Sequence, residues 1–175
     1  MKINHPIYLD SASTSKIDSR VLKEMHPYFT EYFGNASSNH QFGKNAKEAI
    51  ENARKQVSEI INCNSKEIIF TSGATESINL AIKGCIEAST EKGNHIITVT
   101  TEHKAVLSTC EYLETKGTEV TYLNVDKNGL IYLDQLREAV KENTTLVVIM
   151  HVNNETGVIQ PIKKIGEFCR DRDIP

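Results

Sequence analysis

Apolar residues recur along this chain with two different spacings, one typical of helices and one typical of buried strands. Helical spacing, with an apolar residue every third or fourth position, appears first in residues 19–33, interrupted at Pro27, and then in residues 43–61. The same spacing returns in residues 78–86, 104–116, 133–140 and 162–172. Short runs rich in apolar and β-branched residues fall at 67–71, 95–100, 119–123 and 145–150. The pattern therefore predicts four strands that alternate with helices.

This alternation indicates an α/β protein, because a helix between two parallel strands returns the chain to the same end of the sheet. We expect a three-layer α/β/α domain with a mostly parallel sheet and helices on both faces. Residues 145–150 support a parallel sheet, since they are apolar almost throughout, as in a strand buried on both faces. Residues 1–15 precede the first helical pattern and predict an N-terminal arm, which leaves residues 16–175 as the domain.

Composition narrows the class of protein without indicating an activity. Of the 175 residues, 39% are hydrophobic and 25% are charged, as in a folded domain rather than a disordered chain. The net charge of −3, with acids and bases interspersed, gives no reason to expect nucleic acid as a partner. No apolar run approaches the roughly 18 residues of a membrane span, so we expect no membrane partner and a cytoplasmic location. The four cysteines are too widely spaced for a metal motif, and we expect buried thiols and no metal site.

The strand-to-helix turn over residues 70–79 holds the most suggestive chemistry. Small hydroxyl residues surround Gly73 there, and apolar residues at helical spacing follow from Ile78. The first N–H groups of a helix lack partners and carry partial positive charge, so such a turn can bind a phosphate. An ordinary turn capped by Ser72 or Thr75 explains the same residues. The common glycine patterns of nucleotide-binding loops are missing, so a phosphate bound here belongs to another class of ligand.

Polar residues also follow two other predicted strands. Residues 101–103 come after the second strand and residues 151–155 after the fourth, while residues 71–75 come after the first. In parallel α/β sheets, ligands bind at the carboxyl ends of the strands. Three polar clusters at that edge therefore indicate one site.

Individual members of these clusters allow more than one interpretation. His103 opens a helix, where a neutral imidazole can stack on a planar ligand or exchange protons with one, or simply face solvent. Asn153 and Asn154 can hydrogen-bond a ligand or serve the turn before Gly157. We expect His151, at the end of a strand, to be a hydrogen-bonded core histidine.

Five short motifs, taken in order, resemble those of one enzyme family. They are Tyr8-Leu9-Asp10, Phe33-Gly34-Asn35-Ala36-Ser37-Ser38-Asn39-His40, Phe70-Thr71-Ser72-Gly73-Ala74-Thr75-Glu76-Ser77, Thr101-Glu102-His103-Lys104-Ala105-Val106 and Met150-His151-Val152-Asn153-Asn154-Glu155-Thr156-Gly157. On these motifs the chain is similar to the NifS/IscS-type cysteine desulfurases, within the class V aminotransferase group of pyridoxal-phosphate enzymes. The resemblance implies that residues 16–175 are the N-terminal part of a type I large domain.

The resemblance also implies a pyridoxal 5'-phosphate site at the sheet edge. It assigns the cofactor phosphate to Gly73, Ala74 and Thr75. His103 matches the histidine that stacks on the pyridine ring and helps in proton transfer, which makes it the candidate catalytic residue. Asn154 matches the asparagine that hydrogen-bonds the phenolic oxygen of the cofactor. The family's loop near the active-site entrance corresponds to Asn35, Ser37, Ser38 and His40.

The reaction implied by the resemblance takes sulfur from L-cysteine and leaves L-alanine. A persulfide then passes to sulfur-acceptor or scaffold proteins for iron–sulfur cluster or thio-cofactor assembly, and a homodimer is expected. The family's Schiff-base lysine and sulfur-accepting cysteine have no counterpart in residues 1–175, so we expect this chain to be inactive alone. The alternative interpretation is a degenerate, non-catalytic module that binds a partner or a phosphate-bearing ligand.

Overall fold

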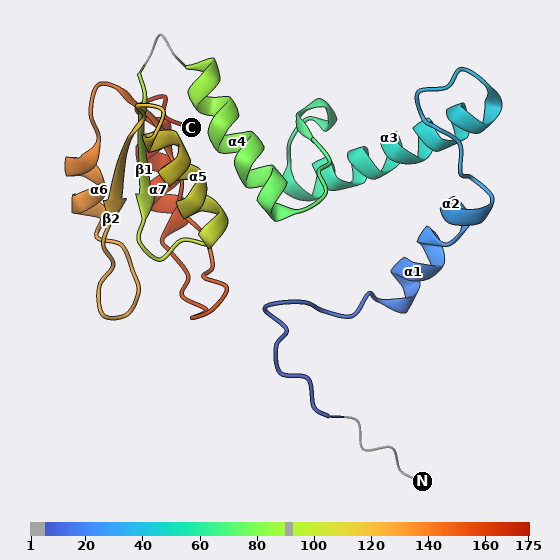
Figure 1. Ribbon diagram of the computed structural model, residues 1–175, viewed down its shortest axis with the longest axis horizontal. Coiled ribbons are helices and arrows are strands. Elements are labelled where there is room, and N and C mark those ends of the chain that lie inside the picture. The colour runs from blue at the N-terminus through green and yellow to red at the C-terminus, as the bar shows by residue number, and fades with distance from the viewer. Residues whose placement is uncertain (1–5, 90–92) are drawn as a thin grey trace. The chain divides into compact units, whose positions relative to one another are not determined.

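The computed structural model describes residues 6–89 and 93–175, and its contacts divide the chain into two compact units. The N-terminal unit ends at Phe70 and the C-terminal unit begins at Thr71, at the change from cyan to green in Figure 1. Residues 6–15 of the predicted arm contain no helix or strand, and a boundary at residue 15 stays a prediction. Among the described residues, no helix is long and apolar enough to cross a membrane.

The described residues of the N-terminal unit, 6–70, contain four helical segments. They are α1 (Ser19–Met25), α2 (Pro27–Thr30), α3 (Gln41–Ile61) and the single-turn 3₁₀ helix η1 (Ser65–Glu67). The Asp18 carboxylate accepts a hydrogen bond from the Arg20 N–H and caps α1. The predicted break at Pro27 is confirmed, because separate helices lie on either side of it. α3 begins slightly before the predicted Gly43, since the His40 side chain accepts a hydrogen bond from the Gly43 N–H and caps the helix.

The predicted strand over residues 67–71 is wrong. Glu67 ends η1, where its side chain and that of Asn64 form a capping box. In the described part of the chain, the residues that follow pair with no strand. The Ile68 carbonyl instead accepts a hydrogen bond from the Arg54 guanidinium of α3. A local cap and an arginine side chain therefore take up backbone groups of this segment, while Ile69 and Phe70 stay 68% and 50% exposed, and no sheet forms there.

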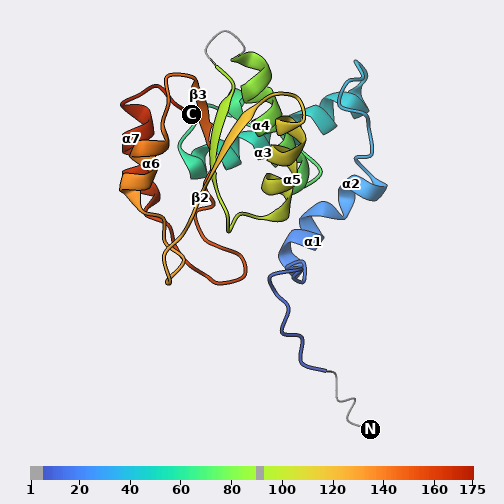
Figure 2. The same ribbon diagram turned by 60° about the vertical axis from the view of Figure 1, so that its left-hand side comes forward.

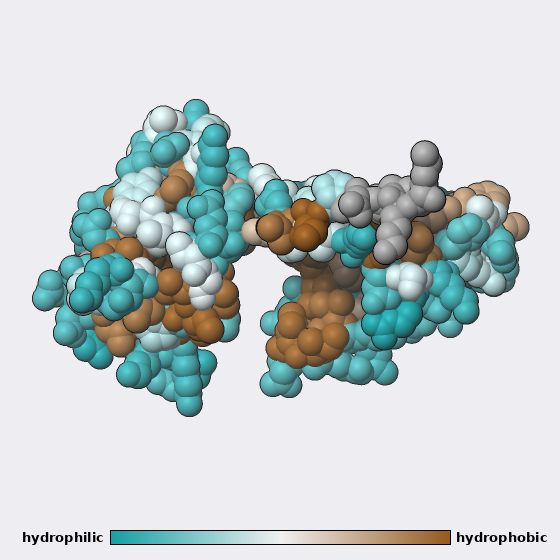
Figure 3. All heavy atoms as spheres, turned by 90° about the horizontal axis from the view of Figure 1, so that it is seen from below, coloured by the Kyte–Doolittle hydropathy of each residue, from teal (hydrophilic) through white to brown (hydrophobic). Residues whose placement is uncertain are grey.

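Most large apolar side chains of the N-terminal unit are exposed. In α3 only Gly43, Ala46 and Ser58 are buried, while Phe29 and Ile60 are 69% and 83% exposed. A groove of about 960 Å³ beside α1 and α3 is lined mainly by aromatic and aliphatic side chains. In Figure 3 such apolar residues appear as brown areas of the surface. The N-terminal unit therefore has little hydrophobic core of its own.

The C-terminal unit contains a three-stranded parallel sheet between helices. Its elements are α4 (Ala74–Ala88), β1 (His95–Val99), α5 (Lys104–Glu114), β2 (Glu119–Leu123), α6 (Leu133–Ala139), β3 (Thr144–Val147) and α7 (Ile162–Arg170). The strand order is β2-β1-β3, and both pairings are parallel. Figure 2 shows α4 and α5 on one face of the sheet and α6 and α7 on the other, which confirms the predicted three-layer α/β/α architecture. The last strand ends at Val147 rather than Met150, and the Met150 N–H donates to the Glu102 side chain instead of to a strand.

Two apolar clusters form the core, one on each face of the sheet. β1 is buried along its whole length, and its alternate side chains point to opposite faces. Ile97 packs with Leu136 and Ile165 of α6 and α7, whereas Ile96 packs with Ile82 and Val106 of α4 and α5. The second cluster holds in place the two helices that begin at the predicted site. Cys110 and Cys169 are buried in these clusters, as expected, while Cys85 is only partly buried.

Glycine is required at residue 93, just before β1. Gly93 has a φ of +150°, and a Cβ there would lie 2.3 Å from the Asn143 carbonyl oxygen. We expect Gly93→Ala to lower the free energy of unfolding by at least about 1 kcal/mol. Gly84 in α4 is the matched control, since a Cβ there meets nothing within 4 Å, and Gly84→Ala should stabilise the chain by up to about 1 kcal/mol. Urea denaturation checks the pair, and shifts of the same sign would contradict this explanation.

Candidate functional site

The turn over residues 71–77 is held by hydrogen bonds among its own side chains. The Thr71 and Ser77 hydroxyl oxygens lie 2.6 Å apart, and Thr71 also donates to the Gly73 carbonyl. The Ser72 N–H donates to the Glu76 carboxylate at 2.6 Å. Hydrogen bonds from Ser72 hold the pKa of the Glu76 carboxyl below its usual value. The Glu76 carboxylate thus binds the Ser72 N–H, and these bonds fix the conformation of the turn where α4 begins.

The first N–H groups of α4 remain available to a ligand. Gly73 is the N-cap residue and gives no side-chain cap, so the predicted capping by Ser72 or Thr75 is not seen. Among the described residues, no group accepts a hydrogen bond from the N–H of Ala74 or of Thr75. A Cβ on Gly73 would meet nothing within 4 Å, so the space beside Gly73 is open. Free N–H groups at the start of a helix suit a phosphate.

His103 caps α5, at the end of the loop that follows β1. Its Nδ1 accepts a hydrogen bond from the Ala105 N–H at 3.0 Å. A nitrogen that accepts in this way has no proton, so the neutral ring carries its proton on Nε2. The predicted place of His103 at a helix start is confirmed, and its side chain is exposed. The cap fixes one ring nitrogen and leaves the other available.

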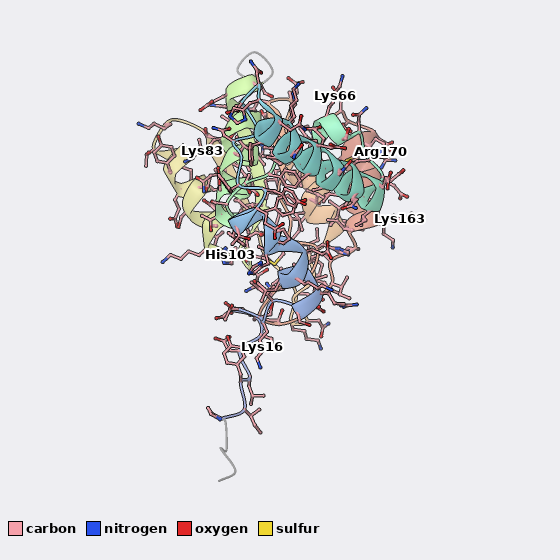
Figure 4. The ribbon with its side chains drawn as sticks, turned by 90° about the vertical axis from the view of Figure 1, so that its right-hand side faces the viewer. Lys16, Lys66, Lys83, His103, Lys163 and Arg170 are labelled. Carbon is pink, nitrogen blue, oxygen red and sulfur yellow. The ribbon has the colours of Figure 1, made fainter. Side chains whose placement is uncertain are left out.

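A groove between α4 and α5 contains both Thr75 and His103. Its volume is about 350 Å³, and its other lining residues include Asn79, Lys83 and Tyr112. Figure 4 shows Lys83 on α4 and His103 in the loop before α5. The Lys83 ammonium lies 4.7 Å from the centre of the Tyr112 ring, a cation–π distance that holds positive charge inside the groove. The structure therefore brings together two of the residues that the sequence places at the cofactor, in a groove with basic character.

Asn154 lies in a hairpin over residues 151–160, called here the 151–160 hairpin. An antiparallel bridge joins Val152 to Ile159, and the Asn153 side chain accepts hydrogen bonds from the Glu155 and Thr156 N–H groups. The turn interpretation is thus confirmed for Asn153. Asn154 is exposed and does not line the α4–α5 groove, and its contact with a cofactor stays a prediction.

His151 differs from its expected surroundings, and another histidine is buried in the core instead. His151 is exposed, so its prediction as a core histidine is wrong, because β3 ends at Val147 and leaves His151 beyond the sheet. His95 is the core histidine, with no exposed surface. Alternation along β1 could have indicated this, since residues 95, 97 and 99 share one face.

Asn35, Ser37, Ser38 and His40 form a local turn in the N-terminal unit. The Asn35 side chain accepts from the Ser37 N–H at 2.9 Å, and its carbonyl accepts from the Ser38 N–H at 2.9 Å. Gly43 fits against this turn, since a Cβ there would lie 2.2 Å from the Ser38 carbonyl oxygen. These bonds explain the polar motif as the start of α3, and its role at an active-site entrance stays a prediction.

The residues of the C-terminal unit fit the phosphate end of pyridoxal phosphate. They offer two unused N–H groups, the Thr75 hydroxyl and open space in front of Gly73. His103 supplies an exposed imidazole in the same groove. These residues therefore offer hydrogen-bond donors for the phosphate, next to an imidazole ring that can stack on a planar ligand.

Comparison with known proteins decides the family. The sequence profile described as aminotransferase class-V matches residues 7–174. The chain belongs to the class-V aminotransferase family. Within this family it is 54% identical to the cysteine desulfurase IscS of Ehrlichia chaffeensis over 173 residues, which cover 99% of this chain and 42% of that protein. It is 56% identical to the cysteine desulfurase IscS of Buchnera aphidicola subsp. Baizongia pistaciae, over 97% of this chain and 43% of that protein.

Solved structures of this family also resemble the chain. A NifS-like protein matches it with a TM-score of 0.92 and 41% identity, over 95% of this chain and 46% of that one. A structure described as SspA in complex with cysteine matches with a TM-score of 0.92 and 43% identity, over 96% of this chain and 48% of that one. This class-V aminotransferase chain thus spans somewhat less than half the length of the relatives it matches.

Proposed function

We propose that the chain forms the phosphate-binding, N-terminal part of a pyridoxal-phosphate-dependent cysteine desulfurase. The observation that carries the proposal is the α4–α5 groove, where Thr75 at the free start of α4 and His103 at the start of α5 meet. Identities of 54% and 56% to cysteine desulfurases, over nearly the whole chain, support this choice within the family. The substrates would be L-cysteine and an acceptor thiol, and the products L-alanine and the persulfide of that thiol.

Each residue has a separate task in this proposal. When bound, pyridoxal phosphate supplies an electron sink for bonds at the substrate α-carbon. The N–H groups of Ala74 and Thr75, exposed beyond Gly73, bind its phosphate. His103 contributes a flat face and a proton on Nε2, because Nδ1 accepts from Ala105. Asn154 hydrogen-bonds the phenolic oxygen of the cofactor.

The wider role follows from the same family. We propose that the persulfide serves iron–sulfur cluster or thio-cofactor assembly, through sulfur-acceptor or scaffold proteins, and that the active form is a homodimer. The exposed apolar groove of the N-terminal unit gives such an assembly a surface to cover. A cytoplasmic location suits the free thiols of Cys63, Cys85, Cys110 and Cys169.

Titration of the 175-residue chain with pyridoxal phosphate, followed by its absorption spectrum, tests the proposal. We expect saturable binding that weakens about tenfold in His103→Ala, because a stacking surface is lost, and roughly three- to tenfold in Thr75→Val, because a phosphate donor is lost. Thr14→Val is the control, since Thr14 is exposed in the N-terminal unit. Equal binding by all four proteins would contradict the proposed site. Binding of phosphate without preference for pyridoxal phosphate would favour a non-catalytic phosphate-binding module.

A further inference from the structure

Two loops that leave the sheet are joined by two side-chain hydrogen bonds. The first loop runs from Thr101 to His103, and the second leads from Met150 into the 151–160 hairpin. The Glu102 carboxylate accepts a hydrogen bond from the Met150 N–H. The Asn153 side-chain amide donates to the Thr101 carbonyl at 2.9 Å. The bonded residues are far apart in the sequence, so these bonds fix tertiary structure rather than a local turn.

Each bond is made beside a residue that the proposed function places at the cofactor. Glu102 directly precedes His103, and Asn153 directly precedes Asn154. We propose that Glu102 and Asn153 are positioning residues, which together hold His103 and Asn154 at a fixed spacing. We call this pair of bonds the clamp. The inference rests on the proposed function, because spacing matters only if both residues contact one planar ligand.

The surroundings of Glu102 support a specific role for its carboxyl group. Glu102 is partly buried, although it lies in a loop where an exposed carboxylate would cost less free energy. Burial raises the pKa of Glu102 above its usual value, and the hydrogen bond from the Met150 N–H opposes this only in part. The carboxyl group of Glu102 is therefore partly removed from water at the position where it accepts the Met150 N–H.

The hairpin needs an attachment at this end. Its other attachment is at its base, where the Gln160 side chain donates to the Gly129 carbonyl and accepts from the Ile131 N–H. These bonds place the base of the hairpin against the 124–131 segment. Among the described residues, no hydrogen bond other than the two clamp bonds joins residues 150–160 to the loop of His103. Without them, His103 and Asn154 would each remain well formed but would move independently.

The clamp can be separated from general folding by comparing two ligands. Inorganic phosphate probes only the start of α4, whereas pyridoxal phosphate also requires the ring contacts. We expect Glu102→Ala to weaken pyridoxal phosphate binding about tenfold and to leave the Kd for inorganic phosphate unchanged. NMR shifts of the Ala74 and Thr75 amides measure the phosphate Kd. Glu102→Gln should restore binding to within about threefold, because its amide oxygen can still accept from Met150.

Asn153→Asp tests the second bond without disturbing the turn. The aspartate keeps an oxygen for the Glu155 and Thr156 N–H groups but cannot donate to the Thr101 carbonyl. It should weaken pyridoxal phosphate binding alone, as Glu102→Ala does. Glu138→Ala, on the exposed surface of α6, is the matched control and should change neither Kd.

Three results would overturn the clamp. One is unchanged pyridoxal phosphate binding in both variants, and another is an equal loss of both ligands, which would indicate general destabilisation. If the wild-type chain binds neither ligand, the proposed function fails, and the clamp is judged on the ligand-free chain. There Glu102→Ala must speed amide hydrogen exchange at Met150 by about tenfold or more while leaving the core of β1 protected. Unchanged exchange at Met150 would be the third contradicting result.

Discussion

Ile96→Ala is expected to lower the free energy of unfolding of the C-terminal unit by about 2–5 kcal/mol. Ile96 has no exposed surface and lies in the centre of β1, where it packs against Ile82 of α4 and Val106 of α5. Truncation removes buried methyl groups and leaves a cavity beneath the two helices that begin at the proposed site. We therefore expect pyridoxal phosphate binding to weaken as stability falls, because both helix starts lose their support.

Urea denaturation followed by far-UV circular dichroism measures the change. Ile159→Ala is the matched control, since the Ile159 side chain is 63% exposed and its truncation should change stability by less than about 0.5 kcal/mol. A loss below about 1 kcal/mol for Ile96→Ala would mean that the sheet is not packed as described.

The second large effect is the pH dependence of the free energy of unfolding, which we expect His95 to cause. His95 is buried between the other two strands, with Nδ1 2.8 Å from the Thr144 hydroxyl and Nε2 2.8 Å from the Thr121 hydroxyl. Burial lowers the pKa of His95, the Lys141 charge lowers it further, and the Glu119 carboxylate partly opposes both. In the unfolded chain the same imidazole titrates near its ordinary pKa of 6.5. Between these two values the unfolded chain therefore binds more protons.

The contribution of His95 to the free energy of unfolding should therefore be constant above pH 6.5 and should fall as the pH decreases below 6.5. The slope from this one group is at most about 1.4 kcal/mol per pH unit, and it ends once the pH passes the folded pKa. Unfolding free energies measured at several pH values below 7 test this. His95→Gln should remove this component of the slope, whereas His151→Gln, at an exposed histidine, should retain it. Identical slopes in both variants would assign the acid sensitivity to other groups.

Periodicity predicted the elements of the C-terminal unit well. The runs that became β1, β2 and β3 are short and apolar, and the helices between them have clear amphipathic spacing. The hydrophobic pattern failed at residues 67–71, because η1 and Arg54 bind backbone groups there and the side chains of Ile69 and Phe70 stay exposed. Only tertiary contacts decide between a strand and an extended segment, and no local signal reports them.

The candidate site was only partly predictable for a similar reason. His103 and the 71–77 turn could be located, since both depend on local strand-to-helix geometry. Glu102 could not be given a role, because its partner Met150 is distant in sequence and donates a backbone N–H that any residue would have. The spacing of Asn153 before Gly157 indicated a turn, but not its amide bond to Thr101.

The strand order β2-β1-β3 also has a consequence for folding during synthesis. β1 pairs with β2 once α5 has formed the crossover between them, and this βαβ unit can assemble first. The other edge of β1 must then wait for β3, which emerges from the ribosome only after α6. During this interval the unpaired backbone groups of a buried, apolar strand are exposed to other nascent chains. Chaperone dependence and off-pathway association should therefore be greatest while the chain between β2 and β3 is being synthesised.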